Sequence, residues 1–325
     1  MGGRAFLQDL SPDSLPRLPP ALYALLKERL SAALKILYEI VEVPAEAPEK
    51  NDHGDIDFVV ARPLGGEEVT PEQVGRALGA VKSIELDGYR TSNYAIEVDV
   101  KVCADEEEVE GITVFHGYGD LGIIICAIAK SYGLSLSPKG LKIASPHPDP
   151  PVHLTSSPRA AFDFMGLSMD RWAEGFETAQ DTFKFAATSR LFDPRRLHVP
   201  QMNSFQKSVG GRNMYRDFLV WAQDKTPAEY TLSSDCDAVE EALVRFGKKA
   251  EWDAAAHERY VRAWLKNNFN GKLIAEWTGL GWRGVKAVMD DVRSSVGGER
   301  TLVGRQMEEI KDLVLASQRL LELSA

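Results

Sequence analysis

The stretch His53-Gly54-Asp55-Ile56-Asp57-Phe58-Val59-Val60 decides the fold expected for this chain, together with Ile96-Glu97-Val98-Asp99-Val100-Lys101-Val102 behind it. Each half predicts a short strand, because apolar residues alternate with or follow charged ones. Residues two apart on a strand point to the same face, so Asp55 and Asp57 present their carboxylates side by side. If the second strand pairs with the first, Asp99 adds a third oxygen donor. Such a cluster is typical of Mg²⁺ sites and of two-metal phosphoryl transfer.

Asp-x-Asp on one strand and a single Asp on a later strand resemble the metal-ligand pattern of the DNA polymerase β superfamily. That superfamily of nucleotidyltransferases includes poly(A) polymerases and CCA-adding enzymes. The resemblance implies that Asp55, Asp57 and Asp99 are catalytic residues and metal ligands, with Mg²⁺ as cofactor and a nucleoside triphosphate as substrate. It also implies an α+β fold, in which a nucleotidyltransferase-like mixed sheet with flanking helices precedes an all-helical C-terminal domain.

The chain departs from that family ahead of the Asp pair. The family places a Gly-Ser or Gly-Gly turn there, which holds the phosphates of the nucleotide. Here the region reads Pro44-Ala-Glu-Ala-Pro-Glu-Lys-Asn-Asp-His53 and contains no such turn. An alternative interpretation therefore stays open, in which Asp55 and Asp57 are solvated carboxylates at a strand start and Asp99 lies on an exposed sheet face.

Composition indicates a globular protein with two domains. The 325 residues exceed the usual size of one domain, and 44% of them are apolar and 26% charged. We expect a nucleotidyltransferase-like domain over residues 1–199 and a helical domain over 200–325. No apolar run is long enough to span a membrane, no secretory signal is visible, and the three cysteines suit a reducing compartment, so we expect a cytoplasmic protein without a membrane partner.

The N-terminal region predicts one long helix. Between Pro20 and Val43 apolar residues recur at helical spacing, which indicates an amphipathic helix leading into the first Asp-bearing strand. Further along, the turn from Phe115 to Gly122 precedes an apolar helix. Its His116 and Asp120 are candidate substrate-binding residues, although Asp120 can equally cap the helix that follows.

Basic residues are concentrated in two places on a chain whose net charge is −10. Between Thr182 and Lys225, eight basic residues face three acidic ones, which favours binding of a phosphate-bearing ligand. The alternative is that these arginines pair with acids of neighbouring helices. The candidate RNA-binding residues of this region are Arg190, Arg195, Arg196, Arg212 and Arg216.

The second place lies in the expected helical domain. The segment from Asn270 to Asp290 predicts a helix–turn–helix with a Gly-rich turn, and it resembles the helical module that follows the catalytic domain of bacterial-type CCA-adding enzymes. Lys272, Arg283 and Lys286 are candidates for binding RNA phosphates, with backbone N–H groups at the helix start. The alternative is a connector that only packs two helices.

Three functions are compatible with these residues. The first is a metal-dependent nucleotidyltransferase acting on RNA, with tRNA or another RNA 3′ end as the partner. The second is a repurposed scaffold that uses aminoacyl-tRNA, resembling fungal arginine-containing cyclodipeptide synthases. In that case the carboxylates, with Glu97, bind a cationic aminoacyl group and no cofactor is needed. The third is a non-catalytic RNA- or protein-binding module.

Overall fold

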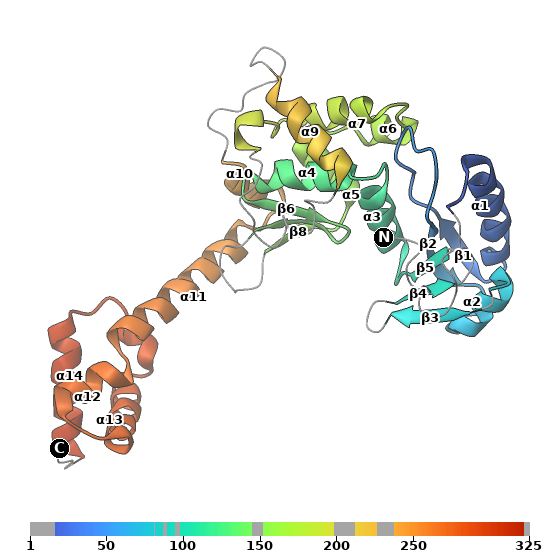
Figure 1. The fold of residues 1–325 in the computed structure, drawn as a ribbon. Helices are drawn as coiled ribbons and strands as arrows, with labels where there is room; N and C mark the ends of the chain where they lie inside the picture. Colours follow the sequence, from blue (N-terminus) through green and yellow to red (C-terminus); the bar gives the residue numbers. More distant parts are fainter. Residues whose placement is uncertain are drawn as a thin grey trace. The chain divides into compact units, whose positions relative to one another are not determined.

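The computed structural model describes residues 17–80, 82–86, 90–94, 98–144, 152–197, 212–225 and 237–321 (Figure 1). The chain is a mixed α+β protein that divides into two compact units, Met1–Phe246 and Gly247–Ala325. The boundary predicted near residue 200 differs from this division. Helix α9 (Asn213–Gln223) packs on α4 (Leu121–Lys130) and α7 (Ala179–Ala187), so it belongs with the first unit.

A five-stranded mixed sheet forms the N-terminal part of the first unit, with strand order β1-β2-β5-β4-β3. Only β2 and β5 run parallel, and the other neighbours are antiparallel. The strands are β1 (Tyr38–Glu42), β2 (Ile56–Pro63), β3 (Ser83–Leu86), β4 (Thr91–Tyr94) and β5 (Val98–Val102).

Side-chain alternation gives this sheet two different faces. Ile56, Phe58 and Val60 of β2 join a buried core with α1 (Pro20–Leu34) and α2 (Pro71–Leu78). The opposite face carries Val59 and Ala61, which pack against α3 (Glu106–His116). Because Asp57 alternates with the first set, it lies on the α3 side of the sheet.

The prediction of one helix from Pro20 to Val43 is wrong for its C-terminal part. The helix ends at Leu34, and residues 38–42 form β1 instead. The segment Tyr-Glu-Ile-Val-Glu also alternates at strand spacing, and its antiparallel pairing with β2, from Tyr38 opposite Pro63 to Glu42 opposite Val59, provides a ladder that a helix could not use.

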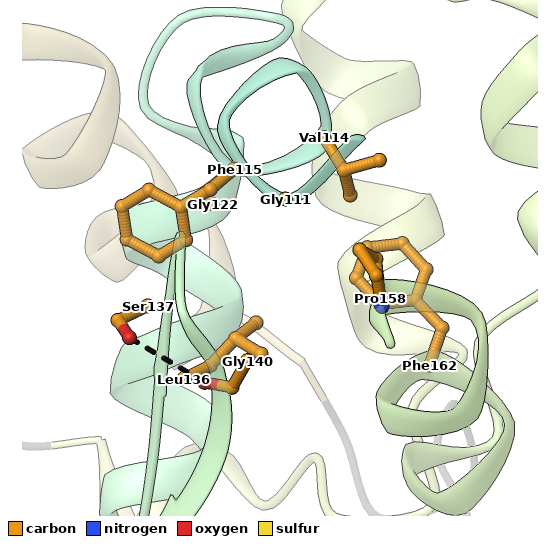
Figure 2. Close-up of a pocket in the computed structure, with 9 residues that line it drawn as sticks. All are labelled: Gly111, Val114, Phe115, Gly122, Leu136, Ser137, Gly140, Pro158 and Phe162. Carbon is orange, nitrogen blue, oxygen red and sulfur yellow. Dashed lines mark hydrogen bonds between the residues drawn. The ribbon is translucent and has the colours of Figure 1, made fainter. Parts of the chain in front are cut away.

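The rest of the first unit is a three-stranded antiparallel sheet, β6-β7-β8, surrounded by helices. In this part, α3 and α4 approach each other closely through their backbones. A Cβ added to Gly122 of α4 would lie 2.0 Å from the Phe115 carbonyl oxygen of α3, so only glycine fits. Gly122 and Phe115 line a small cavity of about 10 Å³, no larger than one water needs (Figure 2). The elements are β6 (Leu134–Ser137), β7 (Gly140–Ile143), β8 (His153–Thr155), α5 (Pro158–Met165), α6 (Met169–Glu174), the 3₁₀ helix η2 (Pro194–Arg196) and α10 (Ala238–Arg245).

The second unit is helical throughout the residues described. Its core gathers Phe269, Ile274, Val288, Ile310 and Val314 from successive helices. The elements are α11 (Lys249–Asn268), α12 (Gly271–Thr278), α13 (Trp282–Ser295), the 3₁₀ helix η4 (Glu299–Leu302) and α14 (Met307–Leu320).

In the described ranges, no single helix is long and apolar enough to cross a membrane. Helices α3 and α4 meet that criterion only when taken together, and a bend of 92° separates them.

Candidate metal centre

Three carboxylates meet at one place on the five-stranded sheet. Asp57 of β2 lies directly opposite Asp99 of β5 in the parallel ladder, and Asp55 precedes Asp57 by two residues. One oxygen from each of the three lies within 4.8 Å of the other two, so the cluster could hold a metal ion. The convergence predicted from strand alternation is therefore observed.

The pKa of Asp57 is raised from its ordinary value of 3.8 to about 6. Removal of solvent by the surrounding protein is the first cause, and the neighbouring Asp55 carboxylate is the second. Asp57 nevertheless keeps an exposed side, as a carboxylate that receives a cation must. The repulsion from Asp55 is the part of the shift that a bound cation would cancel.

Asn93 of β4 is a residue of this centre that the sequence analysis missed. It lies opposite Asp99 in antiparallel register, on the same face, and its Oδ1 is buried without a hydrogen-bond partner among the described residues. An ionised carboxylate cannot donate a hydrogen bond to it. Among the described residues no donor reaches this oxygen, and a donor set made only of oxygens fits a hard divalent metal. Recognising β4 as a separate strand paired with β5 would have revealed Asn93.

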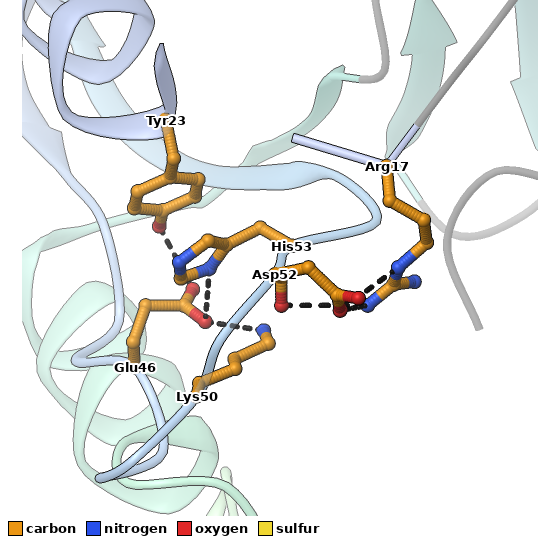
Figure 3. A network of polar contacts seen from close by, with 6 residues as sticks. All are labelled: Arg17, Tyr23, Glu46, Lys50, Asp52 and His53. Atoms are coloured by element: carbon orange, nitrogen blue, oxygen red, sulfur yellow. Dashed lines mark hydrogen bonds and ion pairs between the residues drawn. The ribbon is translucent and has the colours of Figure 1, made fainter. Parts of the chain in front are cut away.

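The connection between β1 and β2, residues 43–55, is pinned to α1 by a polar network (Figure 3). The Tyr23 hydroxyl donates to Glu46 Oε1 at 2.8 Å, and His53 Nδ1 lies 3.1 Å from Glu46 Oε2. The rings of Tyr23 and His53 stack with centroids 3.8 Å apart. His53 also exchanges two backbone hydrogen bonds with Leu18, at 2.8 and 2.9 Å. This network fixes the residues directly before Asp55.

Charge within the connection is largely compensated. Lys50 forms an ion pair with Glu46 and donates a hydrogen bond to it. Burial pushes the pKa of Glu46 up, but hydrogen bonds from Lys50, Tyr23 and His53 outweigh it and hold that pKa below its ordinary value. The ammonium group of Lys50 is therefore already engaged within the chain.

The turn between α3 and α4 anchors the connection from its other side. The Tyr118 N–H donates to the Ala45 carbonyl at 2.7 Å, and a Cβ on Gly119 would lie 2.9 Å from the Cβ of Ala47. His116 lies at the end of α3, where desolvation and then the charge of Arg212 lower the pKa of its imidazole.

Asp120 does not cap the helix that follows it. Its side chain makes no capping hydrogen bond to α4. Instead, Oδ1 accepts a hydrogen bond from Arg212 at 2.8 Å, and Oδ2 accepts one from the backbone N–H of Tyr215 at 3.3 Å. Asp120 thus caps the first turn of α9, whose own N-cap residue offers no side-chain acceptor. Its substrate-binding role stays a prediction.

The arginines of the first unit that were expected to bind RNA are all bonded within the chain. Arg190 and Arg212 pair with an acid on or beside a neighbouring helix, which is the alternative that the sequence analysis left open. Arg195 and Arg196 instead pair with Asp193 of their own segment, and Arg216 bonds an amide oxygen. The RNA-binding role of all five stays a prediction. The set is Arg190, Arg195, Arg196, Arg212 and Arg216, and their guanidinium groups contact Glu241, Asp193, the Ser131 carbonyl, Asp120 and Asn213, respectively.

The cations of the second unit have a different environment. Among the described residues, no carboxylate pairs with Lys272, Arg283 or Lys286, and all three side chains are exposed on α12 and α13. Glu97, the remaining predicted substrate-binding residue, lies outside the described residues.

No protein-family model matches the chain, and no curated protein matches its sequence.

Replacing Asp57 by Asn is predicted to stabilise the metal-free protein in a pH-dependent way. Because the folded-state pKa of Asp57 lies above its ordinary value, the stability associated with its proton is present below about pH 4 and lost as the pH rises through about 6. Thermal unfolding in EDTA should therefore show an advantage for Asp57→Asn that grows between these pH values and then levels off. An advantage that does not vary with pH would contradict this account.

Replacing Asn93 by Leu is predicted to weaken metal binding without lowering the stability of the metal-free protein. Removing an unpaired buried amide oxygen should leave the metal-free protein at least as stable as the wild type. The rise in unfolding temperature produced by Mn²⁺ should shrink, because the site loses an oxygen beside Asp99. Calorimetry with and without Mn²⁺ measures both quantities. A variant that is destabilised without metal but responds normally to Mn²⁺ would show that Asn93 only supports the sheet.

Proposed function

We propose that this chain is a metal-dependent transferase with a nucleotidyltransferase-like fold that acts on RNA, with tRNA or another RNA 3′ end as its substrate. The observation that carries the proposal is the meeting of Asp55, Asp57 and Asp99 within 4.8 Å on two parallel strands. Three clustered carboxylates, of which Asp57 is exposed and Asp55 and Asp99 are half-buried, are costly to keep, and such a cluster is typical of the protein part of a two-metal centre.

The chemistry of the donor set favours Mg²⁺, because every available ligand atom is an oxygen. Asp55 and Asp57 would hold it from β2, and Asp99 would hold it from β5. When bound, Mg²⁺ would activate an RNA 3′-hydroxyl and neutralise triphosphate oxygens. Asn93 would support Asp99 from the neighbouring strand.

The RNA partner is proposed from the charge of the second unit. Residues 247–325 hold 13 basic and 11 acidic side chains, whereas the whole chain has a net charge of −10. Lys272, Arg283 and Lys286 present cations without carboxylate partners among the described residues. Such cations are available to neutralise phosphates, unlike the paired arginines of the first unit.

One observation favours the second candidate function, which uses aminoacyl-tRNA. The connection of residues 43–55 contains no glycine turn before Gly54, and its Lys50 is paired with Glu46. A nucleoside triphosphate would therefore have to be held by other groups. An acidic centre next to Glu46 is instead suited to a cationic aminoacyl group, and that reaction would need no metal.

One set of incubations is predicted to distinguish these functions. Labelled ATP and CTP are incubated with tRNA, and arginyl-tRNA is incubated without nucleotides, each with and without EDTA. The proposal predicts nucleotide incorporation that EDTA abolishes. Asp57→Asn should reduce the rate about a hundredfold or more, because it removes one metal ligand. Asp170→Asn, the same change at an exposed helical position, serves as the control and should have no effect.

The other outcomes have distinct meanings. A product formed from arginyl-tRNA that is insensitive to EDTA would contradict the proposal and support the second candidate. Absence of product in every incubation, with RNA binding intact, would indicate a non-catalytic binding module.

A further inference from the structure

A groove lies between α12 and α13 of the second unit. Its volume is about 430 Å³. Ala275, Val285 and Met289 provide its buried or half-buried apolar lining, and the exposed side chains of Trp282 and Lys286 border it. The apolar lining and the aromatic ring suit a nucleobase, and the cation at the border suits its phosphate.

Trp282 is the unusual member of this groove. It is the first residue of α13, and 74% of its surface is exposed. Trp264 and Trp277 of the same unit pack against the helical core, whereas Trp282 does not belong to that core. An indole left open at this level contributes little to folding, and its ring is accessible to a partner that stacks on it. The guanidinium of Arg283 already lies 5.3 Å from the centroid of the ring.

The charges around the groove favour RNA over a protein surface. Arg293, which also lines the groove, is neutralised by Glu299 and Asp290 at 2.7 and 3.0 Å. Lys286 has no such partner among the described residues, and neither do the nearby Lys272 and Arg283. An apolar protein segment would leave these cations uncompensated, whereas a nucleic acid strand supplies one phosphate for each base.

We propose that this groove binds single-stranded RNA, with an unpaired base stacked on Trp282 and flanking phosphates on Arg283 and Lys286. The base enters the apolar part lined by Ala275 and Met289. This inference rests on the proposed function in naming RNA as the partner, but it concerns the second unit alone and needs none of the carboxylates of the metal centre.

The test measures binding of a short fluorescent oligouridylate to the full-length protein by anisotropy, alongside the same strand with abasic residues. Trp282→Ala should weaken oligouridylate binding about tenfold or more, because one base–aromatic stack is lost. Trp282→Phe should retain part of the affinity. The abasic strand should bind the wild type and Trp282→Ala equally. Lys286→Gln should weaken both strands and reduce the slope of log affinity against log salt by about 1.

Tyr260→Ala is the matched control, since Tyr260 is another exposed aromatic residue of this unit, on α11. It should bind oligouridylate like the wild type. Unchanged binding by a folded Trp282→Ala variant would overturn the proposal, and so would equal affinity of the wild type for both strands or no binding at all. The wild-type protein separates the two proposals, because RNA binding and nucleotide transfer are measured on it independently. Absence of transfer activity in the wild-type protein, with normal, Trp282-dependent binding, would remove the proposed function and leave the groove in place.

Discussion

Parallel pairing of β2 with β5 is the constraint on which the metal centre depends. Parallel neighbours cannot be joined by a tight turn, so the chain between them makes a crossover that contains α2, β3 and β4. The register is fixed by burial on the far face, where Ile56 and Phe58 of β2 lie beside Val98 and Val100 of β5. A shift of one residue would turn the aspartates into that core and expose its apolar side chains.

The centre is also a source of instability that the surrounding structure must offset. Desolvation and then the charge of Asp55 raise the pKa of Asp57, and the buried oxygen of Asn93 has no donor among the described residues. Groups of this kind persist where function requires them. The network of Tyr23, Glu46 and His53 holds the approach to Asp55 rigid from the α1 side, and the turn after α3 holds it from the other.

The parts of the fold that follow from local pattern could be predicted from the sequence. Strand alternation was sufficient to bring Asp55, Asp57 and Asp99 together. Features that depend on contacts between residues far apart in the chain could not be predicted from the sequence. Residues 38–42 are a strand because β2 pairs with them, although their spacing also suited a helix. Asp120 precedes a helix as a cap would, yet it bonds to Arg212, 92 residues away, because α9 packs against that turn. The sequence showed the charge of the arginines but not their acceptors.

The most direct test of the metal centre is the anomalous scattering of Mn²⁺ in crystals of the protein soaked with MnCl₂. The account predicts a peak within bonding distance of carboxylate oxygens from Asp55, Asp57 and Asp99 together, and its loss in crystals of Asp57→Asn. A peak elsewhere, or the absence of any peak at saturating Mn²⁺ in a crystal whose three carboxylates are open to solvent, would contradict it. In that case the three carboxylates would have to be interpreted as a site for an organic cation.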